Sequence, residues 1–473
     1  MKWIWIVIPL ILVGIVGISE SFAQELEIIA SPKHQLESGI LPDDIQCRDN
    51  RILVIRTNGN PACLTPQTAE KLMERGWTIS LTNVEDKKPT NTIPVDLDSS
   101  NIIDANNQFA IDFYSQASLE SDQNIFFSPW SIMTAFAIVS EGARGNTAEE
   151  MQNVFGFSSN KIQRQNEFKS VNDELNQEDS SYSLQVANAL WLADFFEPLK
   201  EYVDIAKKYY DSEVSAVDFV GDEGVDTINS WAAEKTNDKI KTILPPGSTN
   251  ELTRLVITNA IYFKGTWVTQ FDEEHTNDQD FTVDSDTIIK TPMMNLYQNQ
   301  HLYGETENIK ILELPYEGEK LSMLLLLPKE IDGIADLENS LTIENLNYWK
   351  DSLLEQELQI VSIPKFELET KYDLIPPLHK LGINDAFDQN NADFLGITTS
   401  EQLFITSALH KAYVDVNEEG TEAAAVTAIT VGTTSVDPNP PPTFVADHPF
   451  IFVIQDNETG HILFIGRMTN PSE

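Results

Sequence analysis

The stretch from Val416 to Phe450 places the strongest constraint on how this chain can fold, because its two halves have opposite physical character. The first half, residues 420–431, consists mostly of small residues, has no proline and is uncharged after Glu422. The second half, residues 433–443, is polar and contains four prolines. Each proline removes a backbone N–H that a sheet needs as a donor. Only the first half can therefore become an interior strand.

As a strand, the first half would present one face without charge that is small at its start. Successive side chains point to opposite faces of a strand. The local sequence also permits a short helix over residues 422–426, because alanine favours helix, or a surface loop. The two faces are Thr421, Ala423, Ala425, Thr427 and Ile429 on one side and Glu422, Ala424, Val426 and Ala428 on the other.

Two helices are predicted after residue 124. Ser128 can cap the first of them and Pro129 suits its first position. The apolar run over residues 130–139 indicates that this helix is buried. Residues 147–150, Thr-Ala-Glu-Glu, have the pattern of a capping box and predict that the second helix begins there.

Four apolar segments are predicted to be strands. One of them covers residues 255–263 and is expected to end at Gly265. Asn259 is unusual inside it, because a buried amide without partners costs about 1–3 kcal/mol. Asn457 begins a glycosylation sequon. We interpret this segment primarily as the turn between the last two strands, and only secondarily as a glycosylation site. The other strands are residues 182–191, 449–455 and 461–467.

These segments, in this order, resemble the serpin family. The run Val-Asn-Glu-Glu-Gly-Thr-Glu-Ala-Ala-Ala over residues 416–425, followed by a loop and by Asp-His-Pro-Phe at 447–450, resembles a serpin hinge and reactive-centre loop. The resemblance extends over residues 104–471, and no internal repeat is present. It implies one α+β domain at residues 104–473, with three β-sheets, about nine helices and an exposed loop.

The resemblance implies that the protein inhibits serine, or alternatively cysteine, proteases and is not an enzyme. In this family the protease attacks the loop, forms an acyl-enzyme and is carried along when the cut loop inserts into the central sheet. As a strand, residues 420–434 would span roughly 50 Å at about 3.3 Å per residue. Insertion requires a flexible hinge with small inward residues. The matching residues are Glu418, Gly420, Thr421, Glu422, Ala423, Ala424, Ala425 and Thr427.

The family's spacing from the hinge predicts that the scissile bond joins Thr434 to Ser435, with Val436 and Asp437 as alternates because this loop is longer than the common form. No lysine or arginine occurs in residues 420–439, so a trypsin-like target is not expected. Small residues suit an elastase-like or subtilisin-like protease. Because Asp437 lies in the same window, an Asp-specific protease is an alternative target.

The resemblance also assigns a sheet-opening region. Ser128, Ser131, Asn259 and His410 are expected there, with a contact between Asn259 and His410. Without the resemblance, His410 would be interpreted as a solitary, satisfied core histidine.

Two further residues are assigned to the top of the sheet, where the loop first inserts. Trp267 would cap this end; the alternative is an ordinary core tryptophan, and the two interpretations do not exclude each other. Lys290 is expected to pair with Glu418, the glutamate at the start of the hinge.

Two alternative functions remain open. A non-inhibitory serpin, acting as a carrier, chaperone or storage protein, would be cut in the loop without trapping the protease. A hydrolase is not favoured, because the sequence has no Gly-x-Ser-x-Gly nucleophile elbow.

The amino terminus has the pattern of a secretory signal peptide over residues 1–23. Lys2 precedes an apolar run over residues 3–18, and Ser21 and Ala23 are the small residues that signal peptidase requires. An uncleaved membrane anchor is the alternative. The protein is therefore expected outside the cell or at its surface.

Residues 24–82 are predicted to form a small module and residues 83–103 a polar linker. The module contains Cys47 and Cys63, which are expected to form a disulfide behind a signal peptide; a free redox pair is the alternative. The module resembles one that recurs in secreted archaeal proteins, which suggests an archaeal origin for the chain.

Charge limits the partners of this chain. Its 473 residues include 31 Lys and Arg and 74 Asp and Glu, for a net charge of −43. Such a chain repels nucleic acid and anionic membranes. No Cys or His grouping has metal-ligand spacing, and no glycine-rich motif follows a strand. We therefore expect no nucleic-acid partner, metal or cofactor, and the resemblance implies a monomer whose partner is a protease.

Overall fold

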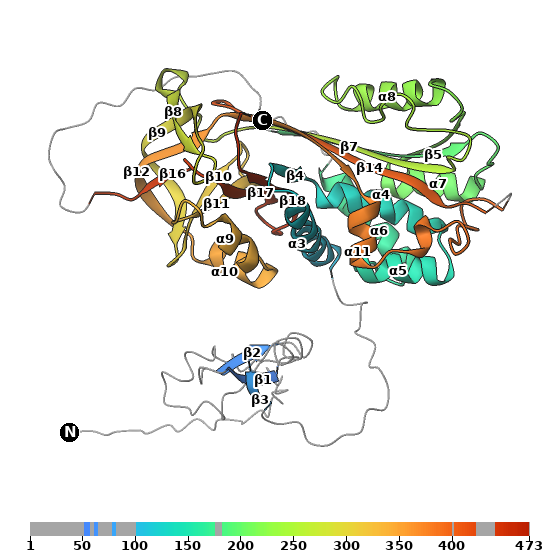
Figure 1. The fold of residues 1–473 in the computed structure, drawn as a ribbon, viewed down its shortest axis with the longest axis horizontal. Helices are drawn as coiled ribbons and strands as arrows, with labels where there is room; N and C mark the ends of the chain where they lie inside the picture. Colours follow the sequence, from blue (N-terminus) through green and yellow to red (C-terminus); the bar gives the residue numbers. More distant parts are fainter. Residues whose placement is uncertain are drawn as a thin grey trace, which may run out of the picture. The chain divides into compact units, whose positions relative to one another are not determined.

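The computed structural model describes residues 52–56, 61–64, 78–81, 101–175, 182–399, 402–421 and 440–472 (Figure 1). The chain divides into two compact units, Met1–Ile93 and Pro94–Glu473. The predicted signal peptide, the predicted linker up to residue 100 and Cys47 lie outside the described residues, and the last residues of the predicted linker, 101–103, belong to the start of a helix.

In the first unit, the described residues form a small antiparallel sheet in the order β2-β1-β3. Its strands are β1 (Ile52–Arg56), β2 (Pro61–Leu64) and β3 (Thr78–Leu81). Cys63 lies in β2. The predicted disulfide stays a prediction.

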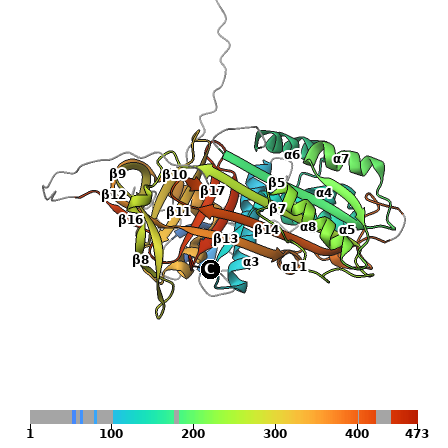
Figure 2. The ribbon, with the colours of Figure 1, turned by 90° about the horizontal axis from the view of Figure 1, so that it is seen from above.

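The second unit contains a six-stranded sheet in the order β13-β14-β7-β5-β6, in which β15 also pairs with β7 (Figure 2). At its centre β14 and β7 are parallel, from Ile405 opposite Leu255 to Tyr413 opposite Tyr262. The strands are β5 (Tyr182–Ala193), β6 (Glu213–Val217), β7 (Leu255–Thr266), β13 (Phe366–Asp373), β14 (Ile405–Val416) and β15 (Gly420–Thr421).

A nine-stranded sheet completes the β structure of this unit, in the order β16-β12-β9-β10-β11-β17-β18-β4 with β8 on β9. In its middle, β11 and β18 are fully buried, and β17 is buried except at its last residue. The strands are β4 (Ile125–Phe127), β8 (Asn277–Thr282), β9 (Ile288–Glu305), β10 (Ile309–Pro315), β11 (Leu321–Pro328), β12 (Leu354–Pro364), β16 (Thr443–Val445), β17 (Phe450–Asp456) and β18 (Ile462–Met468).

The α+β fold expected from the sequence is confirmed, with one difference in the sheets. Three sheets were expected in this unit, but its described strands are hydrogen-bonded into two. The reason is that β9 is long enough to pair with different neighbours, β8 and β10, at its two ends. Gln298 in β9 has a φ of 54°, and the β9–β12 pairing skips it. Residues before Gln298 pair with β8, and residues after it pair with β10.

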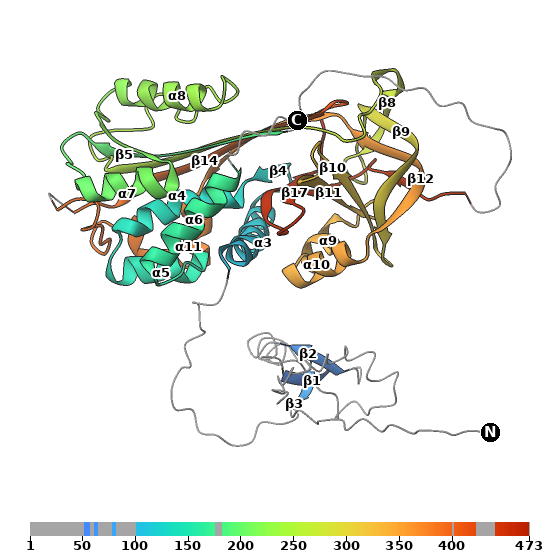
Figure 3. The same ribbon diagram turned by 180° about the vertical axis from the view of Figure 1, so that it is seen from behind.

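Nine α-helices occur in the described residues; most lie on the two faces of the six-stranded sheet, whereas α9 and α10 lie beside the nine-stranded sheet (Figure 1). The helix α8 lies alone on one face, whereas α4, α5, α6 and α11 lie on the other (Figures 1 and 3). None of the described helices is long and apolar enough to cross a membrane. The helices are α3 (Ile102–Glu120), α4 (Pro129–Gly142), α5 (Gly145–Phe155), α6 (Lys161–Leu175), α7 (Lys200–Tyr210), α8 (Glu223–Lys235), α9 (Ile334–Ser340), α10 (Ile343–Asp351) and α11 (Ile375–Leu381).

The start of α4 is as the sequence predicted, and the start of α5 is not. Ser128 caps α4, because its hydroxyl accepts a hydrogen bond from the backbone of Ser131 at 3.2 Å. Every residue of α4 is buried. The second helix begins at Gly145, so the capping box is wrong. Thr147 instead accepts from the backbone of Asp393 at 3.0 Å, so a tertiary contact uses its hydroxyl.

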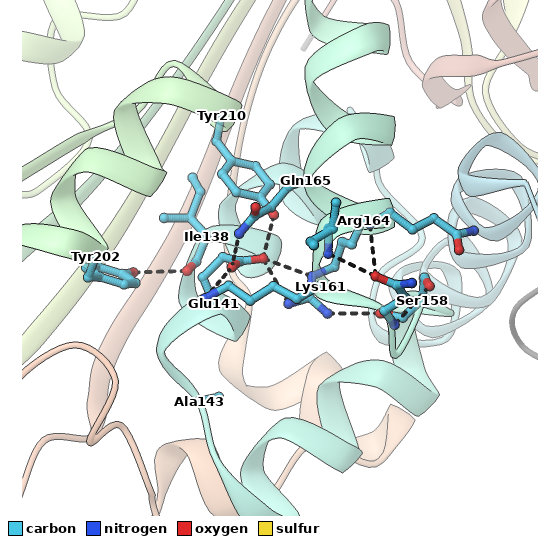
Figure 4. Close-up of polar contacts among 12 residues, drawn as sticks. Ile138, Glu141, Ala143, Ser158, Lys161, Arg164, Gln165, Tyr202 and Tyr210 are labelled. Carbon is cyan, nitrogen blue, oxygen red and sulfur yellow. Dashed lines mark hydrogen bonds and ion pairs between the residues drawn. The ribbon is translucent and has the colours of Figure 1, made fainter.

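A buried carboxylate joins the helices behind the sheet (Figure 4). Glu141 at the end of α4 is fully buried and pairs with Arg164 of α6 at 2.8 Å. Gln165 and Tyr210 also donate to this carboxylate, at 2.7 and 2.9 Å. Lys161 lies 3.3 Å from it. The network therefore links α4, α6 and α7 through one charge.

Candidate functional site

The centre of the candidate site is the seam between β14 and β7. After β14 ends at Val416 the chain turns back, and the backbones of Asn417 and Gly420 exchange hydrogen bonds of 2.9 and 3.2 Å. The chain then enters β15, where Gly420 lies opposite Thr266 and Thr421 opposite Gly265, antiparallel to β7. The residues after β14 therefore begin a new strand at the end of the seam where β14 and β7 both finish.

Gly420 is required at this turn by its backbone and by its surroundings. Its φ is 148°, and a Cβ atom there would lie 2.1 Å from the carbonyl oxygen of Gly265. Only glycine accepts both conditions without a shift of the backbone.

Trp267, directly after β7, holds the hinge turn in place. Its indole N–H donates to the carbonyl oxygen of Asn417 at 3.0 Å, and its backbone N–H donates to that of Glu419 at 3.0 Å. The indole is buried and stacks on Tyr316, with ring centroids 4.5 Å apart. Trp267 therefore lies at the end of β7 beside the hinge. Its role in loop insertion stays a prediction.

The ion pair expected between Lys290 and Glu418 is wrong. Glu418 pairs with Lys365 at 2.8 Å, and Lys290 pairs with Asp280 at 2.8 Å. Register explains the difference. Lys365 directly precedes Phe366, which lies opposite Val416 at the end of β14, whereas Lys290 lies opposite Asp280 in the β8–β9 pair.

The environment of Glu418 favours its charged form. Burial acts to raise the pKa of the Glu418 carboxyl, but the hydrogen bond from Lys365 and a backbone N–H outweigh burial, so the pKa is below its usual value. The start of the hinge is therefore fixed by a carboxylate that is charged at neutral pH.

Four of the predicted residues meet at the middle of the seam. His410 lies opposite Asn259, and its Nδ1 is hydrogen-bonded to the Asn259 carbonyl oxygen. The amide nitrogen of Asn259 reaches the backbone oxygen of Ser131 in α4 at 3.1 Å, and also its hydroxyl. The backbone N–H of Ser128 donates to Nε2 of His410 at 3.1 Å. The predicted contact between Asn259 and His410 is confirmed; its role in opening the sheet stays a prediction.

The same contacts define the protonation of His410. Since Nε2 accepts a hydrogen bond, the proton of the neutral ring lies on Nδ1, which donates to Asn259. Burial lowers the pKa of His410 to about 3. The ring is therefore neutral at physiological pH.

Sequence reasoning missed Asn188, a further polar residue that joins this cluster from β5. It lies on β5 opposite Asn259, and its side-chain oxygen accepts from the amide nitrogen of Asn259 at 2.5 Å. The available signal was a single asparagine between alanines in a strand, the same irregularity that drew attention to Asn259.

The rest of the predicted loop lies outside the described residues. This applies to Glu422, to the hinge residues that follow it and to the proposed scissile residues Thr434, Ser435, Val436 and Asp437. The chain is described again from Pro440 and enters β16, which pairs in parallel with β12.

The fold and this site define a class of protein. A family model described as Serpin (serine protease inhibitor) matches residues 104–471, nearly the whole of the predicted domain. The chain therefore belongs to the serpin family, whose members are in general protease inhibitors and not enzymes.

Three similar proteins show how closely this chain matches known proteins in sequence and in fold. An uncharacterized serpin-like protein of Methanosarcina acetivorans is 42% identical over 372 residues, which are 78% of this chain and 86% of that protein. The leukocyte elastase inhibitor of Homo sapiens is 39% identical over 377 residues, 78% of this chain and 98% of the inhibitor. Human thyroxine-binding globulin, solved with thyroxine, has a TM-score of 0.73 and 30% identity over 79% of this chain and 99% of its own.

Proposed function

We propose that this serpin inhibits serine proteases as a suicide substrate, by inserting its cleaved loop between β14 and β7. The observation that carries the proposal is the parallel β14–β7 pair, with an antiparallel strand already begun at its end by Gly420 and Thr421. A strand inserted there replaces one parallel ladder with two antiparallel ladders, which adds backbone hydrogen bonds.

The register of β15 supports this mechanism. If the pairing of Gly420 with Thr266 on one side and with Asn417 on the other continues, Thr427 comes opposite both Asn259 and His410. Insertion would thus place Thr427 between the two residues whose contact now closes the seam. Residues opposite each other share a face, so Thr427 would point toward α4, as expected for the small inward face.

The chemistry requires no group from the inhibitor except the bond that is cut. The protease serine Oγ attacks the carbonyl carbon of Thr434, an ester forms, and the peptide bond to Ser435 breaks with a proton passing to the new amino group. Water would normally hydrolyse the ester. Insertion of the cut loop draws the attached protease away and distorts it before that step.

The proposed target is an elastase-like or subtilisin-like protease. The absence of lysine and arginine from residues 420–439 supports this choice. The printed name of the leukocyte elastase inhibitor, a relative at 39% identity, agrees with it. Secretion through residues 1–23 would bring the inhibitor to such proteases outside the cell.

The test is to mix the purified protein with one protease of each type, run denaturing gels and sequence the cleaved product. A denaturant-stable adduct with a new amino terminus at residues 435–438 is the expected result. Thr427→Arg should be cleaved at the same bond without trapping, because a long charged side chain cannot enter the seam, whereas Thr427→Ser should trap normally. Cleavage of the wild-type protein without adducts would contradict the proposal and indicate a non-inhibitory serpin.

A further inference from the structure

The strand β13 forms one edge of the six-stranded sheet, and its outer side is open (Figure 2). Among the described strands it pairs only with β14. A cavity of about 880 Å³ lies beside it and is lined by residues 367–372 together with Ser121, Asn124 and Pro471. The free edge of β13 is therefore accessible along most of its length.

The register of β13 on β14 shows which of its backbone groups face outward. The N–H of Leu374 donates to the carbonyl oxygen of Ala408 at 2.8 Å, and this pair continues the register of the two strands. In an antiparallel pair, alternate residues direct both backbone groups to the neighbouring strand. The even-numbered residues of β13 therefore bond to β14, and the backbones of Glu367, Glu369 and Lys371 point outward.

The side chains of these three residues carry charges of both signs. Glu367 and Lys371 are exposed, and neither forms an ion pair with another of the described residues. Glu369 pairs with Lys411 of β14. Burial and the nearby charge of Lys411 lower the pKa of Lys371, so a carboxylate beside Lys371 would favour its charged form. Like charges directly opposite each other destabilise a sheet, whereas β13 offers an opposite charge to a copy of itself.

We propose that β13 pairs with β13 of a second copy of this chain, so that two six-stranded sheets join edge to edge about a two-fold axis. The axis makes the two strands antiparallel, and the outward backbone groups require odd-numbered residues to lie opposite each other. With Glu369 on the axis, Glu367 of each copy lies opposite Lys371 of the other copy. Three residue pairs would then exchange about six backbone hydrogen bonds.

Charge selects this register over the neighbouring ones. Moving the axis one residue toward the carboxyl end of β13 would set Glu367 against Asp373 twice, and moving it the other way would set Glu367 against Glu369 twice. In the proposed register, the one contact between like charges joins the two copies of Glu369. Each of these carboxylates already has Lys411 beside it.

Both reactive loops would stay open to proteases in such a dimer. Phe366 lies opposite Val416, where β14 ends and the hinge begins. Because the two copies of β13 run in opposite directions, the two hinges would lie at opposite ends of the joined sheet. The proposed dimer therefore does not rest on the proposed function, and the rate of protease inhibition should be the same with and without it.

The experiment measures the oligomeric state of the full chain by sedimentation equilibrium. Each copy has a net charge of −43, and about 0.15 M salt screens this repulsion beyond about 8 Å. The wild-type protein should form a reversible dimer at concentrations on the order of 100 μM, because a few cross-strand contacts only modestly exceed the cost of association. Glu367→Lys or Lys371→Glu alone sets like charges opposite each other twice, so the dimerisation constant should fall at least about tenfold.

Two controls restore the opposite charges. The double variant Glu367→Lys with Lys371→Glu exchanges the two signs, and an equal mixture of the two single variants allows mixed pairs with the charges of wild type. Both should recover the dimer, which also shows that each variant is folded. Single variants that dimerise as strongly as wild type would place the interface elsewhere. A wild-type protein that stays monomeric under these conditions would overturn the edge pairing.

Discussion

At the scale of single residues, the structure separates two lysines that look equivalent in the sequence. Lys365 pairs with Glu418, whose side chain is 6% exposed, whereas Lys290 and Asp280 are both about two-thirds exposed. Removing the partner of a buried charge costs more free energy than removing one member of an exposed pair. Water can solvate a charge that is left alone at the surface, but it cannot reach one that is buried.

Lys365→Ala should therefore destabilise the intact protein by about 1–3 kcal/mol, since Glu418 would keep its charge without its partner. Lys290→Ala should cost about 0–1 kcal/mol. Urea unfolding of both variants measures the difference. Equal losses for the two lysines would show that the Glu418 pair contributes nothing specific to the hinge.

Buried histidines predict how stability depends on pH. Burial lowers the pKa of His410 to about 3 and those of His301 and His461 to about 4, below the ordinary value near 6.5. The folded state then holds these rings neutral while the unfolded chain takes up protons. The stabilisation is complete above pH 6.5 and is lost as the pH falls from 6.5 toward 4 and 3.

When the pH is lowered from 7.5 to 5, each of these histidines should reduce the free energy of unfolding by about 2 kcal/mol. His461→Gln should remove one such contribution and flatten the pH dependence, as should His410→Gln. Free energies of unfolding at the two pH values give the slope. A slope unchanged in both variants would contradict the assignment of neutral, buried rings.

At the scale of elements, side chains at the start of a helix can make tertiary contacts in place of the capping contacts that the local sequence pattern predicts. Thr147 has the pattern of a capping residue, yet its hydroxyl accepts from Asp393, and Glu150 accepts from the backbones of Asn384 and Asp385 at 2.8 Å. Both residues thus fix a distant segment to α5 in place of capping it. No local pattern could reveal that segment.

The helices behind the sheet should depend strongly on Glu141. Glu141→Ala leaves the buried guanidinium of Arg164 without its charge partner, which costs about 3–5 kcal/mol. Lys161→Ala should cost only about 0–1 kcal/mol, because that side chain is 44% exposed. Denaturant unfolding tests both.

The double variant Glu141→Leu with Arg164→Met provides the control for the buried charge itself. It should recover much of the stability lost in Glu141→Ala, because a buried ion pair and an apolar pair of similar size are close in free energy. A double variant as unstable as the single one would show that packing, and not charge, explains the loss.

At the scale of the whole molecule, the sheet as described is not the most extensively paired form that this chain can reach. The seam between β14 and β7 holds one parallel ladder. A strand inserted there would form two ladders and bury apolar side chains from the loop. The intact protein is therefore expected to be less stable than the protein cut in its loop.

Cleavage within residues 433–438 should raise the melting temperature by about 10 °C or more, given the free energy of the added pairing and the usual shift per kcal/mol. Calorimetry of intact and cleaved protein measures the change. Cleaved Thr427→Arg should show little or no rise. A wild-type protein that melts at the same temperature after cleavage would rule out insertion.

The sequence by itself determined the family fold, the boundaries of the main strands and helices to within a few residues, and the pairing of Asn259 with His410. The elements follow from local periodicity and from cap residues, whereas the family fold and the pairing of Asn259 with His410 follow from the resemblance of the ordered motifs to serpins. It also determined which residues of the hinge are small enough to enter a sheet.

Only the tertiary structure decided which lysine holds Glu418, that Asn188 joins the seam, that Glu141 connects three helices, and that the strands of the larger unit form two sheets. Each of these depends on which residues of distant segments become neighbours. That choice is made by the register of long strands and by the packing of buried side chains, and neither leaves a local pattern in the sequence.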